Sequence, residues 1–317
     1  MRVLITGVAG FIGSNLAHKC VNMGWEVSGV DDLSNGHLEF IPKLHKFYKS
    51  CFSAKPVLKA IRDKKFDVVI HLAAIPRVSY SVEHPIETND VNVTRTLTLL
   101  DACRGSVNRV VFASSSSVYG GADILPTNEL QPRSPKSPYA LQKAIIEDYL
   151  RLYYELYGLD SACMRFFNVF GPHALGSSPY ATALSAWLTS IHQNKPLRSD
   201  GDGSQSRDLC YVDNVTHALT LAAQHSEPLK ADTFNVACGS RTTNKEILDY
   251  LLEKYPDAQV NHAPWRPGDV MHTQADISKI ERVLGYEVQV YVWEGIIKTV
   301  EWMESAWPTV SKMELRT

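Results

Sequence analysis

The sequence predicts an α/β protein built on a doubly wound parallel sheet, with a smaller α/β lobe following it. Three observations lead to this prediction. Short apolar runs alternate with longer amphipathic segments through the first half of the chain, a glycine-rich loop follows the first run, and the pattern changes beyond Gly171-Pro172. With 317 residues, the chain is long enough for two domains of about 150 residues each.

The first half supplies the strands and helices of the predicted sheet. Its apolar runs are short, rich in β-branched residues and almost continuously hydrophobic, which is typical of parallel strands buried on both faces. The expected strands are Arg2–Thr6, Glu26–Val30, Phe66–Leu72, Arg109–Ser114 and Ser161–Arg165. The expected helices lie near Phe11–Met23, Ser53–Asp63, Asn89–Cys103 and Tyr139–Tyr157. Repeated β-α units of this kind predict a doubly wound sheet.

Beyond residue 172 the segments become shorter and richer in turns. Thr243-Asn244-Lys245-Glu246 is a capping box that opens one helix of this part. We therefore expect a first domain over residues 1–172, to which a segment near 208–237 returns, and a second lobe over 173–317.

Composition and charge exclude several classes of function. The net charge is −2 from 32 basic and 34 acidic residues, so nucleic acid is not an expected partner. No apolar stretch reaches the roughly 18 residues that a membrane span needs. The six cysteines contain no CxxC pair and the eleven histidines form no HExxH motif, so we expect reduced thiols and no metal site. Together these features predict a soluble protein of the cytoplasm.

The segment Thr6-Gly7-Val8-Ala9-Gly10-Phe11-Ile12-Gly13 follows the first strand and opens the first helix. One glycine lets the chain reverse, another lets a pyrophosphate approach the backbone, and the helix N-terminus offers N–H groups to an anion. The second strand ends in Asp31-Asp32, where a carboxylate accepts hydrogen bonds from ribose hydroxyls and repels a 2′-phosphate. The arrangement is of the Rossmann type and predicts NAD rather than NADP. The alternative is a tight βα turn without a ligand.

Two segments match the pattern YxxxK: Tyr139-Ala140-Leu141-Gln142-Lys143 and Tyr250-Leu251-Leu252-Glu253-Lys254. Ser137-Pro138 provides an N-cap and an N1 proline, which place Tyr139 in the first turn of a helix with Lys143 on the same face. A lysine ammonium and an oxidised nicotinamide favour the phenolate of Tyr139, which then serves as a base. The second copy lies in an amphipathic helix and is interpreted as surface.

A run of four serines, Ser114 to Ser117, ends the fourth expected strand and precedes Val118-Tyr119-Gly120. The remaining motifs are the glycine loop, the first YxxxK, His71-Leu72-Ala73-Ala74 and Arg165-Phe166-Phe167-Asn168-Val169-Phe170-Gly171-Pro172. With them the chain resembles the extended short-chain dehydrogenase/reductases. More narrowly, it resembles the NAD-dependent nucleotide-sugar epimerases over nearly its whole length.

The resemblance implies roles for individual residues. Ser115, Tyr139 and Lys143 correspond to catalytic residues, and Ser116 would lie against the sugar. Contacts with the cofactor are implied for Gly7, Gly10, Phe11, Ile12, Gly13, Asp31, Asp32, Asn35, Leu72, Ala73, Ala74 and Asn92, together with Tyr139 and Lys143. Related dehydratases carry an Asp-Glu pair where this chain has Ser116-Ser117, which favours epimerisation over dehydration. His71 is expected to be structural.

The resemblance also implies how a nucleotide sugar binds to the second lobe. Arg207 and Arg266 would bind the diphosphate, Asp269 the nucleotide ribose, and Asn168 a phosphate or the sugar. On sequence alone, a surface salt bridge explains a lone arginine better. Family members usually offer the base an apolar or aromatic wall where this chain has Leu197-Arg198-Ser199, and uridine remains the predicted nucleoside.

The choice of sugar is predicted from one position, Thr273. Family members with a tyrosine here are restricted to glucose and galactose, so the small threonine leaves room for a 2-acetamido group. The alternative is an inert surface threonine.

The expected function is inversion at C4 of a UDP-hexose through a 4-keto intermediate, with NAD regenerated in each cycle. The expected substrates are UDP-N-acetylglucosamine and UDP-N-acetylgalactosamine, with UDP-glucose and UDP-galactose also open, in polysaccharide biosynthesis. Three alternatives remain: a UDP-glucuronate 4-epimerase, for which Arg77 is the visible cation; a ketosugar reductase, which Asp31 disfavours; and a non-catalytic NAD sensor. Helices like Asn89–Cys103 and Tyr139–Tyr157 pair in family homodimers, so a homodimer is expected.

Overall fold

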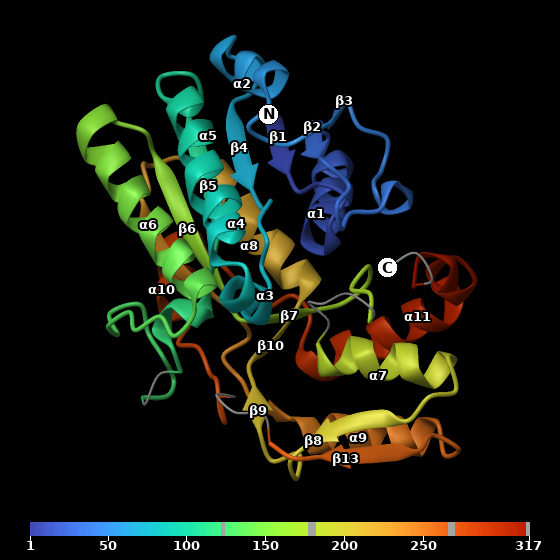
Figure 1. Cartoon of the computed structure of the whole chain (residues 1–317). Helices are drawn as coiled ribbons and strands as arrows, with labels where there is room; N and C mark the ends of the chain where they lie inside the picture. Colours follow the sequence, from blue (N-terminus) through green and yellow to red (C-terminus); the bar gives the residue numbers. More distant parts are fainter. Residues whose placement is uncertain (122–123, 177–181, 266–269, 315–317) are drawn as a thin grey trace.

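The computed structural model describes residues 1–121, 124–176, 182–265 and 270–314. The strands of the central sheet are β1 (Arg2–Thr6), β2 (Glu26–Asp31), β3 (Lys46–Lys49), β4 (Val68–His71), β5 (Arg109–Ser115), β6 (Ser161–Phe166) and β11 (Asp232–Val236). All seven are parallel, in the order β11-β6-β5-β4-β1-β2-β3. The predicted doubly wound α/β sheet is confirmed (Figure 1).

Helices cover both faces of this sheet. They are α1 (Phe11–Asn22), α2 (Lys55–Arg62), α3 (Val78–Glu83), α4 (Pro85–Asn89), α5 (Thr96–Cys103), α6 (Pro138–Tyr157) and α8 (Val212–Gln224). The alternating side chains of β1 separate the two faces, because Val3 and Ile5 belong to an apolar core shared with α1 and α8. Leu4 belongs to a second core shared with α2, α5 and α6. All three β1 side chains are completely buried, which is why the run reads as continuously apolar.

Strand β11 pairs with β6 and lies within the segment near 208–237 that was expected to return to this domain. Two parts of the sheet domain differ from the prediction. The edge strand β3 is half-exposed, and its sequence Lys46-Phe47-Tyr48-Lys49 does not resemble the buried strands. The expected single helix Asn89–Cys103 is divided by a π-helical turn, Asp90–Arg95, which separates α4 from α5. The buried side chain of Asn92 in this turn bonds to a loop outside the helix.

The second lobe follows β6 by way of β7 (Asn168–Phe170), so it lies beyond the carboxyl edge of the sheet (Figure 1). Its elements are α7 (Ala183–His192), β8 (Leu197–Asp200), β9 (Ser206–Arg207), β10 (Leu209–Tyr211), β12 (Thr242–Thr243), α9 (Asn244–Lys254), β13 (Val260–Ala263), α10 (Ser278–Leu284) and α11 (Val292–Glu314). The predicted capping box is present, because Thr243 and Glu246 exchange side-chain to backbone hydrogen bonds. Within the described ranges, no helix has the length and apolarity needed to cross a membrane.

Candidate active site

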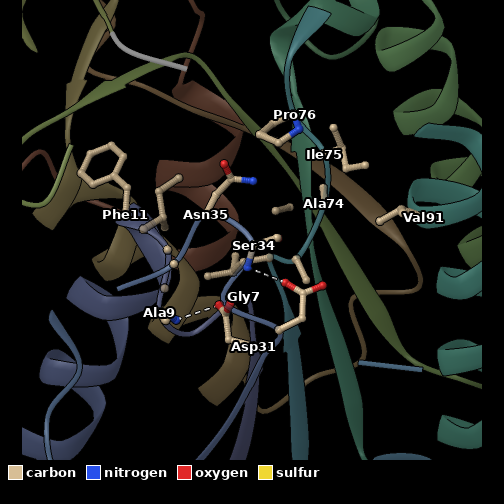
Figure 2. A pocket seen from close by; sticks show the side chains of 18 of the residues that line it. Gly7, Ala9, Phe11, Asp31, Ser34, Asn35, Ala74, Ile75, Pro76 and Val91 are labelled. Carbon is tan, nitrogen blue, oxygen red and sulfur yellow. Dashed lines mark hydrogen bonds between the residues drawn. The ribbon is translucent and has the colours of Figure 1, made fainter. Parts of the chain in front are cut away.

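A cavity of about 760 Å³ opens at the carboxyl ends of β1, β2, β4 and β5. Its lining includes the glycine loop, Val30 to Asp32 and Ser34 to His37 at and after the end of β2, residues 72–77 after β4, and Ala113, Ser114, Tyr139 and Lys143. Figure 2 shows how these segments converge, with Phe11 and Asp31 on one side and Ala74, Ile75 and Pro76 across from them. Crevices at this edge of α/β sheets are where such proteins bind ligands.

The glycine loop leaves no room for side chains. Gly7 has a φ of +70°, and a Cβ there would lie 2.9 Å from the amide nitrogen of Ala73. A Cβ on Gly13 would overlap the carbonyl oxygen of Gly7 and lie 2.9 Å from the Cα of Val8. Gly10 is the N-cap of α1 and has no side chain to cap the helix. Phe11 and Ile12, the first two residues of α1, line the cavity. The amides of Gly7 to Gly10 donate to Val30, Asp31 and Gly7, so the N–H groups left to bind an anion are those of the first turn of α1.

Asp31 lies at the end of β2 and lines the same cavity. Its carboxylate accepts hydrogen bonds from the amides of Ala9 at 2.9 Å and Leu33 at 2.8 Å. Burial raises the pKa of Asp31, and the two amides oppose that rise. Each carboxylate oxygen keeps a free lone-pair direction, so the group suits two ribose hydroxyls and repels a phosphate. Asp32 and Asn35 line the cavity beside it, and the site fits NAD (Figure 2).

The loop after β4 is held by a buried histidine network. Thr6 Oγ1 accepts hydrogen bonds from the amides of Leu72 and Ala73, so its proton points to His71 Nδ1 at 2.7 Å. The other ring nitrogen of His71 is 3.0 Å from Thr96 Oγ1. Burial lowers the pKa of His71 to about 3, so the ring is neutral. His71 is structural, as expected, and it fixes Leu72, Ala73 and Ala74 against the cavity.

Asn92 acts on this loop from behind. Its side-chain oxygen accepts from the amide of Ile75 at 2.8 Å, and its nitrogen donates to the carbonyl of Ile75 at 3.0 Å and to Gln142 Oε1 at 2.8 Å. Ile75 lines the cavity, whereas Asn92 is not among the described lining residues. Asn92 therefore clamps the backbone of the loop after β4, and its implied contact with the cofactor stays a prediction.

Tyr139 and Lys143 lie together at the start of α6. Ser137 caps the helix by accepting from the amide of Ala140 at 3.2 Å, and the amide of Tyr139 donates to Ser81 Oγ at 3.1 Å. Both side chains are buried and line the cavity. Lys143 Nζ donates to the carbonyl of Ala113 at 2.7 Å and lies 5.7 Å from the centre of the Tyr139 ring. Burial lowers the pKa of Lys143 to about 7, and the carboxylate of Glu147 opposes this shift.

Glu147 joins α6 to the end of β5, a connection that the sequence analysis missed. It lies one turn after Lys143 and accepts from Ser114 Oγ at 2.6 Å and from Arg165 at 2.9 and 2.6 Å. Arg165 also donates to the hydroxyl of Tyr119 at 2.8 Å. All of these partners are buried. The i,i+4 spacing of Lys143 and Glu147 was a visible signal, but the spacing does not identify Ser114 and Arg165 as partners.

The serine run is divided among different roles. Ser114 lines the cavity, and its Oγ donates a hydrogen bond to Glu147 Oε1. Ser115 is the last residue of β5, and its Oγ accepts from the amide of Ser117 at 3.2 Å and from Ser117 Oγ at 2.9 Å. Ser116 begins a short 3₁₀ turn, Ser116–Tyr119, and is half-buried.

Three of the predicted substrate residues, Asn168, Arg207 and Thr273, lie on neighbouring segments. The amide of Thr273 donates to the carbonyl of Ser206, and Thr273 Oγ1 accepts from the amide of Asp208, both at 3.1 Å. Arg207 Nη1 donates to the carbonyl of Met271 at 3.1 Å, so Arg207 and Thr273 lie on neighbouring segments. Asn168 pairs in register with Leu209, two residues after Arg207. Arg266 and Asp269 lie outside the described residues.

Asp208 holds these segments together. Its carboxylate accepts from the amides of Cys238 at 3.0 Å, Gly239 at 3.1 Å and Ala275 at 3.0 Å. The side chain is completely buried, and burial raises its pKa to about 6 while the three amides oppose the rise. One carboxylate thus joins the strand that carries Arg207 to the end of β11 and to the Thr273 segment.

In the second YxxxK, Lys254 is exposed as predicted, whereas Tyr250 is half-buried against the apolar core. Tyr250 packs edge-on against Trp293 at 5.8 Å, and Lys254 Nζ lies 3.1 Å from the carboxylate of Glu304. Both residues belong to α9 in the second lobe, and neither lines the cofactor cavity among the described residues.

Comparison with known proteins agrees with this geometry. Residues 3–237 match the NAD dependent epimerase/dehydratase family. A UDP-glucose 4-epimerase of Mycolicibacterium smegmatis is 35% identical over 96% of this chain and 99% of its own length. A UDP-glucuronate 4-epimerase of Thermodesulfobacterium geofontis is 34% identical over 94% and 95%, respectively. A solved UDP-N-acetylglucosamine 4-epimerase from Methanobrevibacter ruminantium M1, in complex with UDP-N-acetylmuramic acid, is 33% identical with a TM-score of 0.89 over 96% and 98%.

The family match and these similarities confirm the resemblance on which the site residues were assigned, including the use of NAD. The chain belongs to the NAD-dependent epimerase/dehydratase family and is an epimerase of the extended short-chain dehydrogenase/reductase fold.

Proposed function

We propose that this enzyme inverts C4 of a UDP-hexose through a 4-keto intermediate, with UDP-N-acetylglucosamine and UDP-N-acetylgalactosamine as its preferred pair. The observation that carries the proposal is the placement of Tyr139 and Lys143 in the cavity that the glycine loop and Asp31 also line. A base beside a nicotinamide is what reversible oxidation of an alcohol requires.

The residues of the site divide the chemistry among them. Tyr139 removes the proton of the sugar 4-hydroxyl and later returns a proton to the same oxygen. Ser115 donates a hydrogen bond to that oxygen, and Lys143 favours the phenolate of Tyr139 by its charge. Gly7, Gly13 and Asp31 line the site that would hold NAD, and the bound cofactor would supply reversible acceptance of a hydride from C4. Arg207 holds the diphosphate, so the sugar turns while the nucleotide stays in place.

The preference for an N-acetylated sugar rests on Thr273. The threonine side chain is short, and its hydroxyl accepts a hydrogen bond from the amide of Asp208. This bond holds the side chain against its own lobe. A pocket wall of this size accommodates a 2-acetamido group that a tyrosine would exclude. The relatives act on three different sugars at nearly equal identity, so identity alone does not select among them.

UDP-glucuronate is the second candidate substrate, and Arg77 favours it. Arg77 lines the cavity, and its Nε donates a hydrogen bond to Ser79 Oγ at 3.1 Å. A uronate carboxylate would find a cation there. A ketosugar reductase is not supported, because Asp31 repels the 2′-phosphate of NADPH.

We also propose that the enzyme is a homodimer in which α6 pairs with its copy. Three leucines of α6 are exposed to solvent in the monomer: Leu141 at 49%, Leu152 at 43% and Leu156 at 66%. Exposed leucines along one helix indicate a surface that another protein covers. Light scattering tests this, because Leu152→Glu combined with Leu156→Glu is expected to convert a dimer to a monomer.

The experiment that tests the function uses purified enzyme without added NAD. It is incubated separately with UDP-N-acetylglucosamine, UDP-glucose and UDP-glucuronate, and the products are identified by proton NMR. Conversion of UDP-N-acetylglucosamine to its 4-epimer at the highest rate supports the proposal. Faster conversion of either other sugar contradicts the preference while keeping the reaction, and no conversion even with added NAD contradicts the reaction.

A further inference from the structure

The serine run at the end of β5 holds hydroxyls whose hydrogen bonds differ in direction. Ser114 Oγ donates to Glu147 Oε1, so its proton is taken by a buried carboxylate. Ser115 Oγ instead accepts two hydrogen bonds, from the amide of Ser117 and from the hydroxyl of Ser117. A serine oxygen has two lone pairs and one proton. Ser115 therefore uses both of its acceptor positions within the chain and keeps its proton for another partner.

This arrangement limits what Ser115 does beside a bound sugar. Its hydroxyl donates to the oxygen on C4, but it has no lone pair left with which to take up a proton from that oxygen. The proton of the 4-hydroxyl then passes directly to Tyr139 and not through Ser115. One residue acts as a donor throughout, and the other moves the proton.

We propose that Ser117 is a positioning residue that fixes Ser115 as a hydrogen-bond donor to the C4 oxygen, an inference that rests on the proposed 4-epimerase reaction. Neither Ser115 nor Ser117 is among the described residues that line the cofactor cavity, and Ser117 acts through Ser115 because its amide and its hydroxyl both donate to Ser115 Oγ. The neighbouring Ser114 does not compete for the same oxygen, because its proton is engaged with Glu147.

The bond from Ser117 also changes the strength of the donor. A hydroxyl that accepts hydrogen bonds becomes a better donor, because the bonds along a chain polarise one another. Negative charge develops on the C4 oxygen as its proton leaves and before the hydride has departed, so a stronger donor stabilises the transition state more than the ground state. The loss of Ser117 is therefore expected to lower kcat and leave KM unchanged.

A double-mutant cycle tests this role. Steady-state kcat and KM are measured with the UDP-hexose that the wild-type enzyme converts fastest, for Ser115→Ala, Ser117→Ala and both together. We expect Ser115→Ala to lower kcat about 100-fold and Ser117→Ala to lower it about three- to tenfold. Because Ser117 acts only through Ser115, the double variant is expected to have the kcat of Ser115→Ala alone.

Two further measurements separate this role from a structural one. Ser117→Thr keeps the hydroxyl and is expected to retain the wild-type kcat. Ser115→Ala is expected to keep the wild-type pH profile at its lower rate, because its hydroxyl does not carry the proton. An unchanged kcat in Ser117→Ala, an equal loss in both backgrounds, or a displaced pH profile in Ser115→Ala overturns the proposal. A wild-type enzyme without 4-epimerase activity overturns the proposed function instead.

Discussion

The two sides of the active site are assembled from very different lengths of chain. On the cofactor side, Gly7 and Gly13 belong to one loop, and Tyr139 and Lys143 to one turn of one helix. On the substrate side, direct hydrogen bonds join Arg207 and Asp208 to the Thr273 segment, and the Asp208 carboxylate accepts from amides 30 and 67 positions away. Local motifs thus set the proposed chemistry, and long-range contacts set the shape of the proposed sugar site. The same chemistry can then serve different sugars when the second side changes.

The largest effect is expected from the catalytic tyrosine, and the chain contains its own control. Tyr139→Phe removes the base, and kcat should fall about 10²- to 10⁴-fold. Tyr250→Phe changes the same residue in the second YxxxK, which lies on α9 against Trp293, and should leave kcat unchanged. Initial rates by NMR or a coupled assay measure both. Equal losses in the two variants would contradict the assignment of Tyr139 as the base, because Tyr250 is not among the described residues that line the cofactor cavity.

Gly13→Ala tests whether NAD binding depends on the close approach of Gly13 to the backbone of Gly7. The new Cβ would overlap the carbonyl oxygen of Gly7, and neither backbone segment can move as a side chain would. We expect the affinity for NAD to fall about 100-fold, at the upper end of the cost of overpacking. NAD released from denatured protein measures the retained cofactor. Gly24→Asn is the control, because nothing lies within 4 Å of a Cβ there and asparagine tolerates its φ of +74°. Wild-type NAD content in Gly13→Ala would contradict the glycine-loop assignment.

The difference between the two sides also explains what the sequence predicts. The strands, the glycine loop, Asp31 and the capped YxxxK helix all follow from spacings of a few residues. Glu147 and Asp208 do not, because a buried carboxylate is defined by partners such as Ser114 or Ala275 that only the folded chain brings near. The π-helical turn is missed for a similar reason, since the bond from Asn92 to Ile75 spans 17 residues. Strand β3 escapes notice because an edge strand has a half-exposed face.

Thr273→Tyr tests the substrate side without touching the chemistry. A tyrosine at this position should fill the space proposed for the acetamido group, while the smaller 2-hydroxyl of UDP-glucose still fits. The ratio of kcat/KM for UDP-N-acetylglucosamine to that for UDP-glucose should fall about tenfold. Thr273→Ser keeps the hydroxyl bonded to Asp208 and should leave the ratio unchanged. An unaltered ratio in Thr273→Tyr would mean that this residue does not face the sugar.

The smallest expected effect is a pH dependence of the free energy of unfolding. Its sign differs between Lys143, the buried charge of the cofactor side, and Asp208, the buried charge of the substrate side. Burial lowers the pKa of Lys143 from 10.5 to about 7, so between these pH values the unfolded chain binds more protons and stability rises with pH. Asp208, with its pKa raised from 3.8 to about 6, acts in the opposite sense, and its contribution falls as pH rises through that lower window.

Lys143→Met removes the cost of burying the ammonium, and that cost is complete at pH 7 and below. The free energy of unfolding of NAD-free enzyme should therefore rise relative to wild type by more than about 1 kcal/mol at pH 7, and this gain should shrink steadily towards pH 9.5. Urea unfolding at several pH values measures it. Lys254→Met, in the second YxxxK, removes an exposed ion pair with Glu304 and should show no such trend. If the gain in the free energy of unfolding of Lys143→Met does not change with pH, side-chain packing and not the buried ammonium destabilises the wild-type enzyme.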